Sequence, residues 1–339
     1  MDRRQLLFGV TALGLASNLK FRHPLISQVA DSTGGNRRLS DRERHRLHGA
    51  VKKCSEFVAD ETESMSEAEY AADGRLMVWR GRTLRGSVER VYSNDAAGKL
   101  VSITGTGSDI TDEVHYDDQG RRTEMRTVPP RPGRETNAFS TEIMFDVAEE
   151  GDDLNRGGTV TTRYNDDDQP VESLVRDTHG LLLTRITHNY ADGRLVSEML
   201  VRGNFDLPKE FLEGPSGGQL SEQQQRALRA QMKEMLSQSG FDRAERSYFY
   251  DGQGRVARLL TLIGTSRQET TTTYNEHGDK AGIITIHSGS LLHDNSKLPS
   301  DSRFEIRYLY EYDTHGNWTE QTTVGESLPS AMHRKLTYY

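Results

Sequence analysis

A short motif, Tyr-Asp-x-x-Gly-Arg, recurs along the chain and constrains its fold more than any other feature. The motif is complete at Tyr116 ("YDDQGR") and Tyr250 ("YDGQGR"), and altered copies begin at Tyr190, Tyr274 and Tyr312. Asp or Asn can open a turn by accepting backbone N–H bonds, and Gly can adopt the left-handed backbone that reverses the chain. Each copy therefore predicts a tight turn between two strands, with the Tyr ring covering the end of the first strand.

The spacing of the copies predicts one hairpin per repeat. Tyr92 and Tyr116 are 24 residues apart, and so are Tyr250 and Tyr274. A period in the twenties with one turn in each unit is typical of repeated supersecondary units. Weaker copies begin at Tyr70, Tyr92, Tyr164 and Arg176. The residues assigned a structural role in the repeat are Tyr116, Asp117, Gly120, Arg121, Tyr190, Gly193, Arg194, Tyr250, Asp251, Gly254, Arg255, Tyr274, Asn275, Gly278, Tyr312, Asp313 and Gly316.

The segments between the turns have the composition of strands. Runs such as "SVERVY", "KLVSIT", "DEVHY", "TTTTY", "GIITIH" and "EIRYLYEY" are short, β-branched or aromatic, and partly alternating. Helices and strands do not alternate along the chain, which disfavours a parallel doubly wound sheet. Only 34% of the 339 residues are hydrophobic, which suits an antiparallel sheet with one solvated face. We expect a mainly β fold: a curved antiparallel meander of hairpins, open or half-closed, with two accessory helices.

The motif copies resemble the YD-repeat, or Rhs-type, family over roughly residues 70–339. That resemblance implies long antiparallel strands joined by hairpins and wound into a curved sheet. Large members of the family form shells that enclose a toxic domain, and other members are extracellular proteins linked to adhesion and carbohydrate binding. This chain is much shorter than the shell-forming members, so the resemblance implies a small open or half-closed sheet with helices against its concave face.

Two segments outside the repeat read as helices. Residues 40–60 open with capping-box spacing at Ser40 and Glu43, and their apolar residues, including Val51 and Cys54, fall three and four apart. This helix could cover a sheet edge or plug a half-closed barrel, and the sequence leaves both open. A helical insertion is expected at about residues 207–240. Its helix begins after Ser221 and is stopped by Gly240. The repeat domain is expected to span residues 61–339, with this helical insertion inside it.

The N-terminus has the pattern of an export signal. Residues 1–16 carry two arginines followed by an apolar run too short to span a bilayer, and the paired arginines are similar to a twin-arginine signal. Residues 17–39 are expected to be a flexible linker. No cysteine follows the apolar run, so nothing indicates a lipid anchor. We expect a bacterial periplasmic or secreted protein without a stable membrane anchor.

The sequence gives no sign of catalytic or metal chemistry. The linear motifs of serine hydrolases, zinc proteases, phosphate-binding loops and dinucleotide-binding folds are absent. The single cysteine, Cys54, excludes an internal disulfide and reads as a buried apolar residue. Histidines recur before the turn glycine at His179, His277 and His315, where exposed hairpin tips are the simpler interpretation. We therefore expect no catalytic residue, no metal site, no cofactor and no enzymatic activity.

Aromatic side chains are the best candidates for ligand contacts. Trp79, Trp318 and the many tyrosines could stack on the apolar C–H side of a sugar ring, although cross-strand packing also explains them. The net charge of −8 disfavours nucleic acid as a partner. We expect a non-enzymatic exported protein that binds a polysaccharide or protein of the cell envelope. The alternatives are a delivery component related to the YD-repeat shells and a periplasmic carrier of apolar ligands. The oligomeric state stays open.

Overall fold

The computed structural model describes residues 40–58, 61–83, 86–106, 111–128, 158–176, 180–203, 220–238, 240, 242–289, 301–325 and 330–339. Its eighteen strands form one antiparallel sheet. The strands are β1 Val51–Val58, β2 Ser66–Tyr70, β3 Leu76–Thr83, β4 Gly86–Asn94, β5 Leu100–Thr106, β6 Thr111–Tyr116, β7 Arg122–Val128, β8 Gly158–Tyr164, β9 Pro170–Arg176, β10 Leu182–Ala191, β11 Arg194–Arg202, β12 Arg243–Tyr250, β13 Val256–Ile263, β14 Ser266–Tyr274, β15 Lys280–Ser288, β16 Asp301–Tyr312, β17 Trp318–Gly325 and β18 Ser330–Tyr338. The predicted mainly β meander of hairpins is confirmed.

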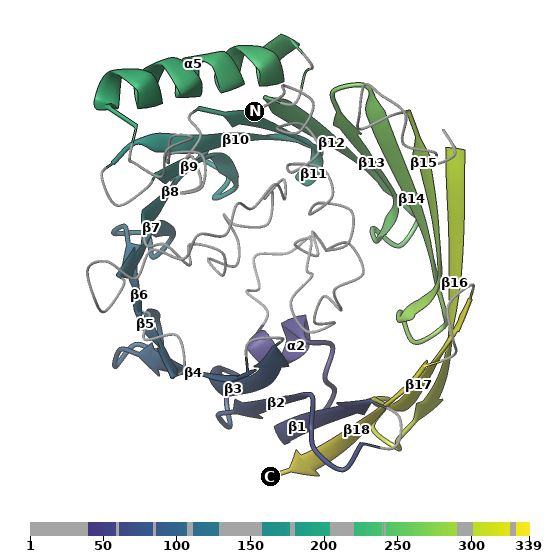
Figure 1. Ribbon diagram of the computed structural model, residues 1–339. Coiled ribbons are helices and arrows are strands. Elements are labelled where there is room, and N and C mark those ends of the chain that lie inside the picture. The colour runs from purple at the N-terminus through teal and green to yellow at the C-terminus, as the bar shows by residue number, and fades with distance from the viewer. Residues whose placement is uncertain are drawn as a thin grey trace.

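The sheet closes on itself into a barrel (Figure 1). Each strand pairs with the next one along the chain, and β1 pairs with both β2 and β18. In the β1–β18 ladder, Cys54 lies opposite Leu336 and Glu56 lies opposite Arg334. The expectation of an open or half-closed sheet is therefore wrong. Closure satisfies the backbone groups that an open edge would leave unpaired.

The predicted helix over residues 40–60 is also wrong beyond its first turn. The capping box at Ser40 is present, but it opens only the four-residue helix α2, Asp41–Arg44. The apolar residues that follow belong to β1. A bulge in β1 between Val51 and Lys53 lets Val51 and Cys54, three residues apart, face the same side. The bulge therefore gave a strand the three-residue spacing of a helix, and this strand closes the barrel.

The buried face of the wall is its inner face. Leu47, just after α2, packs in a cluster with Val51, Cys54, Tyr70 and Trp79, and α2 lies inside the ring of strands (Figure 1). A second inner cluster lies on β8–β12 and contains Val160, Val175, Ile186, Leu200 and Ala244.

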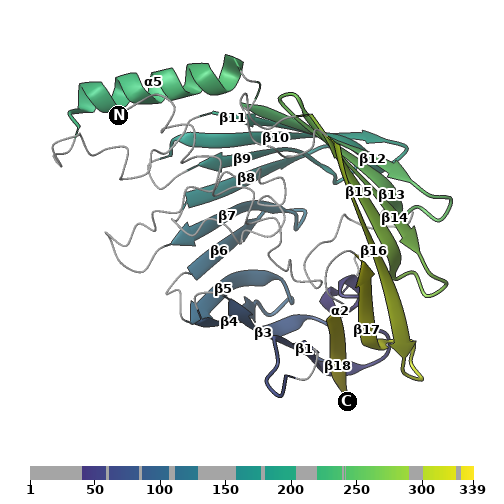
Figure 2. The ribbon, with the colours of Figure 1, turned by 45° about the vertical axis from the view of Figure 1, so that its right-hand side comes forward.

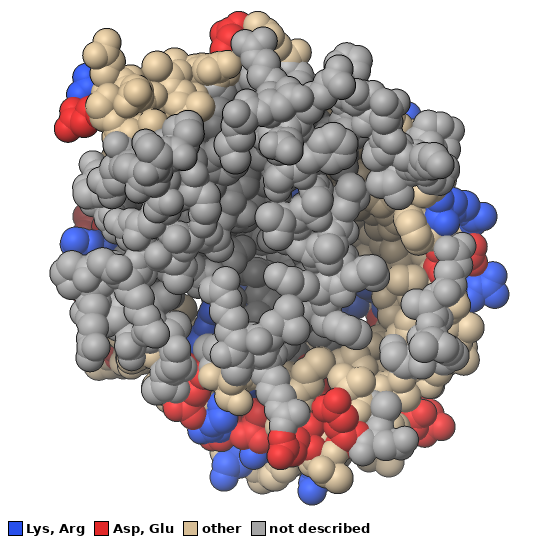
Figure 3. All heavy atoms as spheres, in the orientation of Figure 1, with Lys and Arg blue, Asp and Glu red and all other residues tan. Residues whose placement is uncertain are grey.

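Several ion pairs lie on the opposite, outer face. Arg80 bonds Glu67, Glu69 and Glu89 on neighbouring strands, and Glu269 pairs with Arg267 at 2.6 Å. Charged side chains are accordingly visible around the margin of the view down the barrel (Figure 3).

The helix expected within the insertion is present as α5, Glu222–Gln238, whereas residues 207–219 of that insertion lie outside the described residues. The Ser221 side chain accepts a hydrogen bond from the backbone N–H of Gln224, as the capping spacing predicts. However, α5 lies outside the ring beside β10, and not against the concave face as expected (Figures 1 and 2). Among the described residues, no helix is long and apolar enough to cross a membrane.

Candidate functional site

The repeat motif builds one end of the barrel, which we call the motif rim. In an antiparallel meander, every turn from an even-numbered strand to the next lies at the same end. The described turns there are residues 71–75, 95–99, 117–121, 165–169, 192–193, 251–255, 275–279 and 313–317. The connections at the other end vary much more in length, from residues 84–85 to residues 203–242.

In six of the described motif turns, the side chain of the first residue accepts backbone hydrogen bonds: Asp95, Asp117, Asn165, Asp251, Asn275 and Asp313. Asp117 Oδ1 accepts hydrogen bonds from the backbone N–H groups of Gln119 and Arg121, at 3.0 and 2.9 Å. Its other oxygen lies 2.7 Å from Arg121 Nε, and Gly120 has a φ of 76°. The turn at Asp251 repeats this pattern, with 2.9 Å to the N–H of Arg255 and a φ of 82° at Gly254. The predicted roles of Asp and Gly are therefore visible in these two complete copies, and the motif Arg adds an ion pair with the Asp of its own turn.

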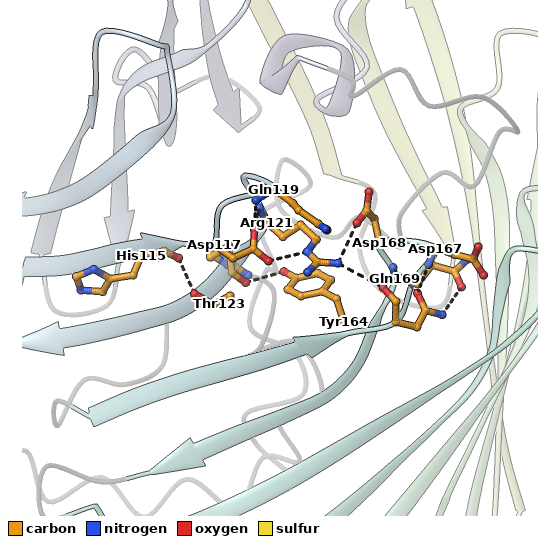
Figure 4. Close-up of polar contacts among 11 residues, drawn as sticks. His115, Asp117, Gln119, Arg121, Thr123, Tyr164, Asp167, Asp168 and Gln169 are labelled. Carbon is orange, nitrogen blue, oxygen red and sulfur yellow. Dashed lines mark hydrogen bonds and ion pairs between the residues drawn. The ribbon is translucent and has the colours of Figure 1, made fainter.

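The tyrosines of several motifs, at Tyr164, Tyr250, Tyr274 and Tyr312, join their hairpins to the preceding one. Tyr164 OH donates to the carbonyl of Arg122 at 2.7 Å, and the Arg121 guanidinium lies 5.4 Å from the Tyr164 ring centre. Arg121 also bonds Asp168 of the next turn at 3.0 Å. Figure 4 shows these contacts running from one turn to the next.

The same contact recurs further round the rim. Tyr250 OH donates to the carbonyl of Leu195 at 2.7 Å, and Tyr274 OH donates to the carbonyl of Val256 at 2.9 Å. Arg255 lies 4.4 Å from the Tyr274 ring centre. The tyrosines therefore link neighbouring repeats, a role that goes beyond the covering of a strand end expected from the sequence.

We expect Gly254→Val to lower the melting temperature. A side chain at a φ of +82° adopts the left-handed backbone, which costs about 1–2 kcal/mol. Its Cβ would also lie 3.2 Å from Arg194 Nη2. Gly252 is the matched control, because it lies in the same turn with open space around its added Cβ. Thermal unfolding of Gly254→Val and Gly252→Val tests the assignment, and an unchanged melting temperature in Gly254→Val would contradict it.

The rim should also lose stability in acid. The hydrogen bond from the Arg121 backbone N–H is the main cause that holds the pKa of Asp117 below its ordinary value. Partial burial raises the pKa of Asp251, but the hydrogen bonds from Arg255 outweigh it and the pKa is lowered. A carboxyl whose pKa is lower in the folded chain stabilises the fold above its unfolded pKa, and that stability is lost as the pH falls through the folded value.

The pH range in which this stability is lost therefore lies below about pH 4, the ordinary pKa of aspartate. We expect the denaturation midpoint of an Asp117→Asn/Asp251→Asn variant to change less between about pH 6 and about pH 3 than the parent midpoint does. Urea unfolding at a series of pH values measures this difference. Equal pH dependence in the two proteins would show that these carboxylates do not stabilise the turns.

The segment around α2 forms hydrogen bonds with three turns of the motif rim. The Arg42 backbone N–H donates to the Gly74 carbonyl at 2.9 Å, and Arg46 Nη1 donates to the Gly278 carbonyl. His48 N donates to Asn317 Oδ1 at 2.7 Å, and Asn317 Nδ2 donates back to the His48 carbonyl at 2.9 Å. Two roles were considered for residues 40–60, covering a sheet edge and plugging the barrel. Strand β1 pairs with the sheet edges, and α2 lies inside the ring of strands at the motif rim (Figure 1).

The histidines of this region take part in side-chain packing. His45 Nδ1 lies 2.5 Å from Tyr70 OH, and burial lowers the pKa of His45 to about 4. His315 stacks on Tyr338 at 4.3 Å and His277 on Tyr312 at 3.9 Å. His179 lies outside the described residues, which contain no group of three or more His, Cys, Asp or Glu side chains placed to hold a metal ion.

A buried polar network on β9–β12 has the Ser–His–Glu arrangement of a hydrolase triad. His188 lies 3.4 Å from Ser173 Oγ through Nε2 and 2.9 Å from Glu198 Oε1 through Nδ1. Tyr248 OH donates to the other Glu198 oxygen. Ser173, however, is only 1% exposed, and a nucleophile needs room for the substrate carbonyl beside it. We therefore interpret these residues as structural and not catalytic: their hydrogen bonds fix how the strands pair.

A second buried network lies beneath α2. Glu56 is fully buried, with its Oε1 3.0 Å from both Nε and Nη2 of Arg334 and its Oε2 2.7 Å from Ser66 Oγ. The Arg334 guanidinium lies 3.5 Å from the Trp318 ring centre. Neither buried network was identified from the sequence, where Glu56 falls in a segment predicted as a helix and Glu198 is one charge in the repeat region.

The two tryptophans are not available for stacking on a ligand. Trp79 is 5% exposed and belongs to the inner cluster near α2. Trp318 is 6% exposed and is covered by Arg334. Cross-strand and core packing, the other interpretation of these residues, describes their surroundings. Cys54 is fully buried, and burial raises the pKa of its thiol to about 12, as suits a buried apolar residue.

Away from Trp318, the inner face of β13–β17 differs from the buried clusters near α2 and on β8–β12 because its side chains remain partly exposed. Directly opposite residues share a face, and pairing passes from Val58 to Met332, from Met332 to Gln321 and from Gln321 to Tyr310. Tyr310 therefore lies on the same inner face as Glu56. Alternation along β16 places Phe304, Ile306 and Tyr308 on this face as well.

Hydroxyl side chains surround these aromatic residues. Phe304 lies opposite Thr285, which lies opposite Thr270, and Tyr308 lies opposite Thr323. Further inward positions are occupied by residues such as Leu259, Thr261, Thr272, Ile283 and His287. Away from the motif rim, no Asp, Glu, Lys or Arg occupies an inward position in the described parts of β13–β17. We call this region the uncharged inner face.

The alternation in "RFEIRYLYEY" carried the signal for this surface. Aromatic residues at 304, 308 and 310 share one face of β16, and charged residues together with Leu309 occupy the other face. The sequence could not show which face points inward, since that depends on closure of the barrel.

Comparisons with known proteins do not assign a family. No family model matches the sequence, and a search of curated proteins gives no match. Among solved structures, a porin-like protein from Bacteroides uniformis is similar over 85% of this chain and 96% of its own, with 11% identity and a TM-score of 0.39. A porin-like protein from Bacteroides vulgatus is similar over 85% and 98%, with 12% identity and a TM-score of 0.36.

A third similar structure is a TcdB2-TccC3-Cdc42 complex. It matches over 80% of this chain but only 13% of the other, with 11% identity and a TM-score of 0.29. At such low scores these similarities carry no argument about function. The chain is thus an antiparallel barrel protein with a hairpin repeat, and its resemblance to the YD-repeat family rests on the motif copies alone.

Proposed function

We propose that this protein is an exported, non-enzymatic barrel that binds a polysaccharide or protein of the cell envelope on its uncharged inner face. The observation that carries the proposal is the partial exposure of this face, while the inner faces near α2 and on β8–β12 are packed into buried clusters. Binding surfaces are commonly concave and largely apolar, with a few polar groups that orient the ligand.

The outer face carries both charged and apolar side chains. Ion pairs such as Arg80–Glu89 at 2.6 Å and Arg267–Glu269 at 2.6 Å cross or follow its strands, and Ile286, Leu309 and Val324 are also exposed there. The export signal pattern of residues 1–16 is the feature that supports an envelope location.

The test is a pull-down with the purified full-length chain against fractionated bacterial envelope. We expect saturable capture that is reduced in Thr285→Arg, which places a charge on the uncharged inner face, and retained in Thr322→Arg, which places the same charge on the outer face. Equal capture by both variants, or no capture by the parent, would contradict the proposal. Protease treatment of the envelope separates a protein partner from a polysaccharide.

A further inference from the structure

The chemistry of the uncharged inner face indicates which ligand it suits. Aromatic and aliphatic side chains alternate there with threonine hydroxyls, as at Phe304 beside Thr285 and Tyr308 beside Thr323. Such a surface offers apolar area and hydrogen-bonding groups but no formal charge. A ligand that matches it must itself be neutral and must carry both apolar faces and hydroxyl groups.

Other ligand classes fit this surface less well. A phospholipid or an acidic glycan brings a charge that finds no charged partner on β13–β17 away from the motif rim, and burying an unpaired charge is costly. A purely apolar ligand would leave the Thr270 and Thr285 hydroxyls, which lie 3.4 Å apart, with only each other as partners. Neutral sugars satisfy both conditions, because a pyranose has an apolar C–H face and a rim of hydroxyl groups.

The aromatic residues of β16 are placed to provide the stacking surface. Phe304 is 48% exposed, and its ring lies 6.0 Å from that of His287. The rings of Tyr308 and Tyr310 are 6.4 Å apart. Tyr310 OH donates to the Lys280 carbonyl at 2.8 Å and accepts from Gln321 Nε2 at 2.9 Å. These bonds fix the Tyr310 ring, which lies beside Tyr308.

We infer that this surface binds a neutral glycan, with Phe304 and Tyr308 stacking on its sugar rings and the facing threonines bonding its hydroxyl groups. This inference rests on the proposed function and narrows its ligand class. It places the sugar contacts on β16, away from the two buried tryptophans.

The test is calorimetric titration of the full-length chain with two kinds of probe: neutral hexasaccharides of glucose in β-1,4 and α-1,4 linkage, and an acidic oligogalacturonate. We expect at least one neutral probe to bind and the acidic probe to bind more weakly. Phe304→Ala and Tyr308→Ala should each weaken neutral binding by about tenfold. Leu309→Ala on the same strand, outward and 62% exposed, should leave it unchanged.

The outcomes separate the inference from the proposed function. Preference for the acidic probe, or neutral binding that survives both aromatic substitutions, would overturn the neutral-glycan assignment. Binding of none of the probes would overturn it too, and the envelope pull-down would still stand if it showed capture sensitive to Thr285→Arg. Far-ultraviolet circular dichroism of each variant shows that a loss of binding does not come from unfolding.

Discussion

Arg334→Met is expected to lower the free energy of unfolding by about 3–5 kcal/mol, as measured by urea denaturation. Glu56 is fully buried, and its Oε1 accepts two hydrogen bonds of 3.0 Å from Arg334. Without the guanidinium, the carboxylate would be left in the interior with only Ser66 as a partner. The cost arises because one charge is left uncompensated.

The matched control removes both charges. A Glu56→Leu/Arg334→Met variant has no buried charge at this point, and exchange of a buried ion pair for apolar residues is often neutral or stabilising. We therefore expect the double variant to be more stable than Arg334→Met alone. A double variant that is no more stable than the single one would show that packing of Arg334 on Trp318 matters more than the ion pair.

Glu198→Leu, in the buried network on β9–β12, should lower the free energy of unfolding by about 2–5 kcal/mol, because it leaves two buried donors without their acceptor. Tyr248 OH donates to one oxygen of Glu198, and His188 Nδ1 lies 2.9 Å from the other. Burial raises the pKa of Tyr248, and the nearby Glu198 charge raises it further. The phenol therefore remains a donor throughout the neutral range.

An outer-face glutamate provides the comparison for this variant. Glu269 bonds Arg267 and lies near Arg258 on the solvated side of the wall, where an ion pair is worth about 1 kcal/mol or less. Glu269→Leu should therefore shift the urea midpoint much less than Glu198→Leu. Adding Tyr248→Phe to Glu198→Leu should recover part of the loss, and fully additive costs would contradict the hydrogen-bonded network.

Local chemistry made the rim predictable. An Asp or Asn followed by Gly at fixed spacing specifies a turn through contacts within five residues, so Asp117–Arg121 and Asp251–Arg255 could be predicted without knowledge of the fold. The tyrosine contacts could not, because Tyr164 reaches a carbonyl that lies in the previous hairpin. Such contacts depend on the stagger of neighbouring hairpins, which no single repeat encodes.

Closure and the inner face were hidden for a related reason. The spacing of Val51 and Cys54 matches a helix, and only the bulge in β1 reveals why a strand has it. Once this segment is taken for a helix, the sheet lacks its closing strand, and the two faces of β16 cannot be told apart. The alternation of Tyr308 and Tyr310 was visible in the sequence, whereas the direction in which they point was not.

Closure of the barrel by β1 and β18 is the central structural claim, because it defines an inner face at all. Native-state hydrogen exchange of the full-length chain, resolved at single amides, tests it most directly. We expect the amides of residues 51–58 and 330–338 that bond across the β1–β18 ladder to exchange as slowly as those of β10 and β11. Fast exchange of alternate amides along either strand, as at an open sheet edge, would contradict closure and with it the assignment of an inner binding face.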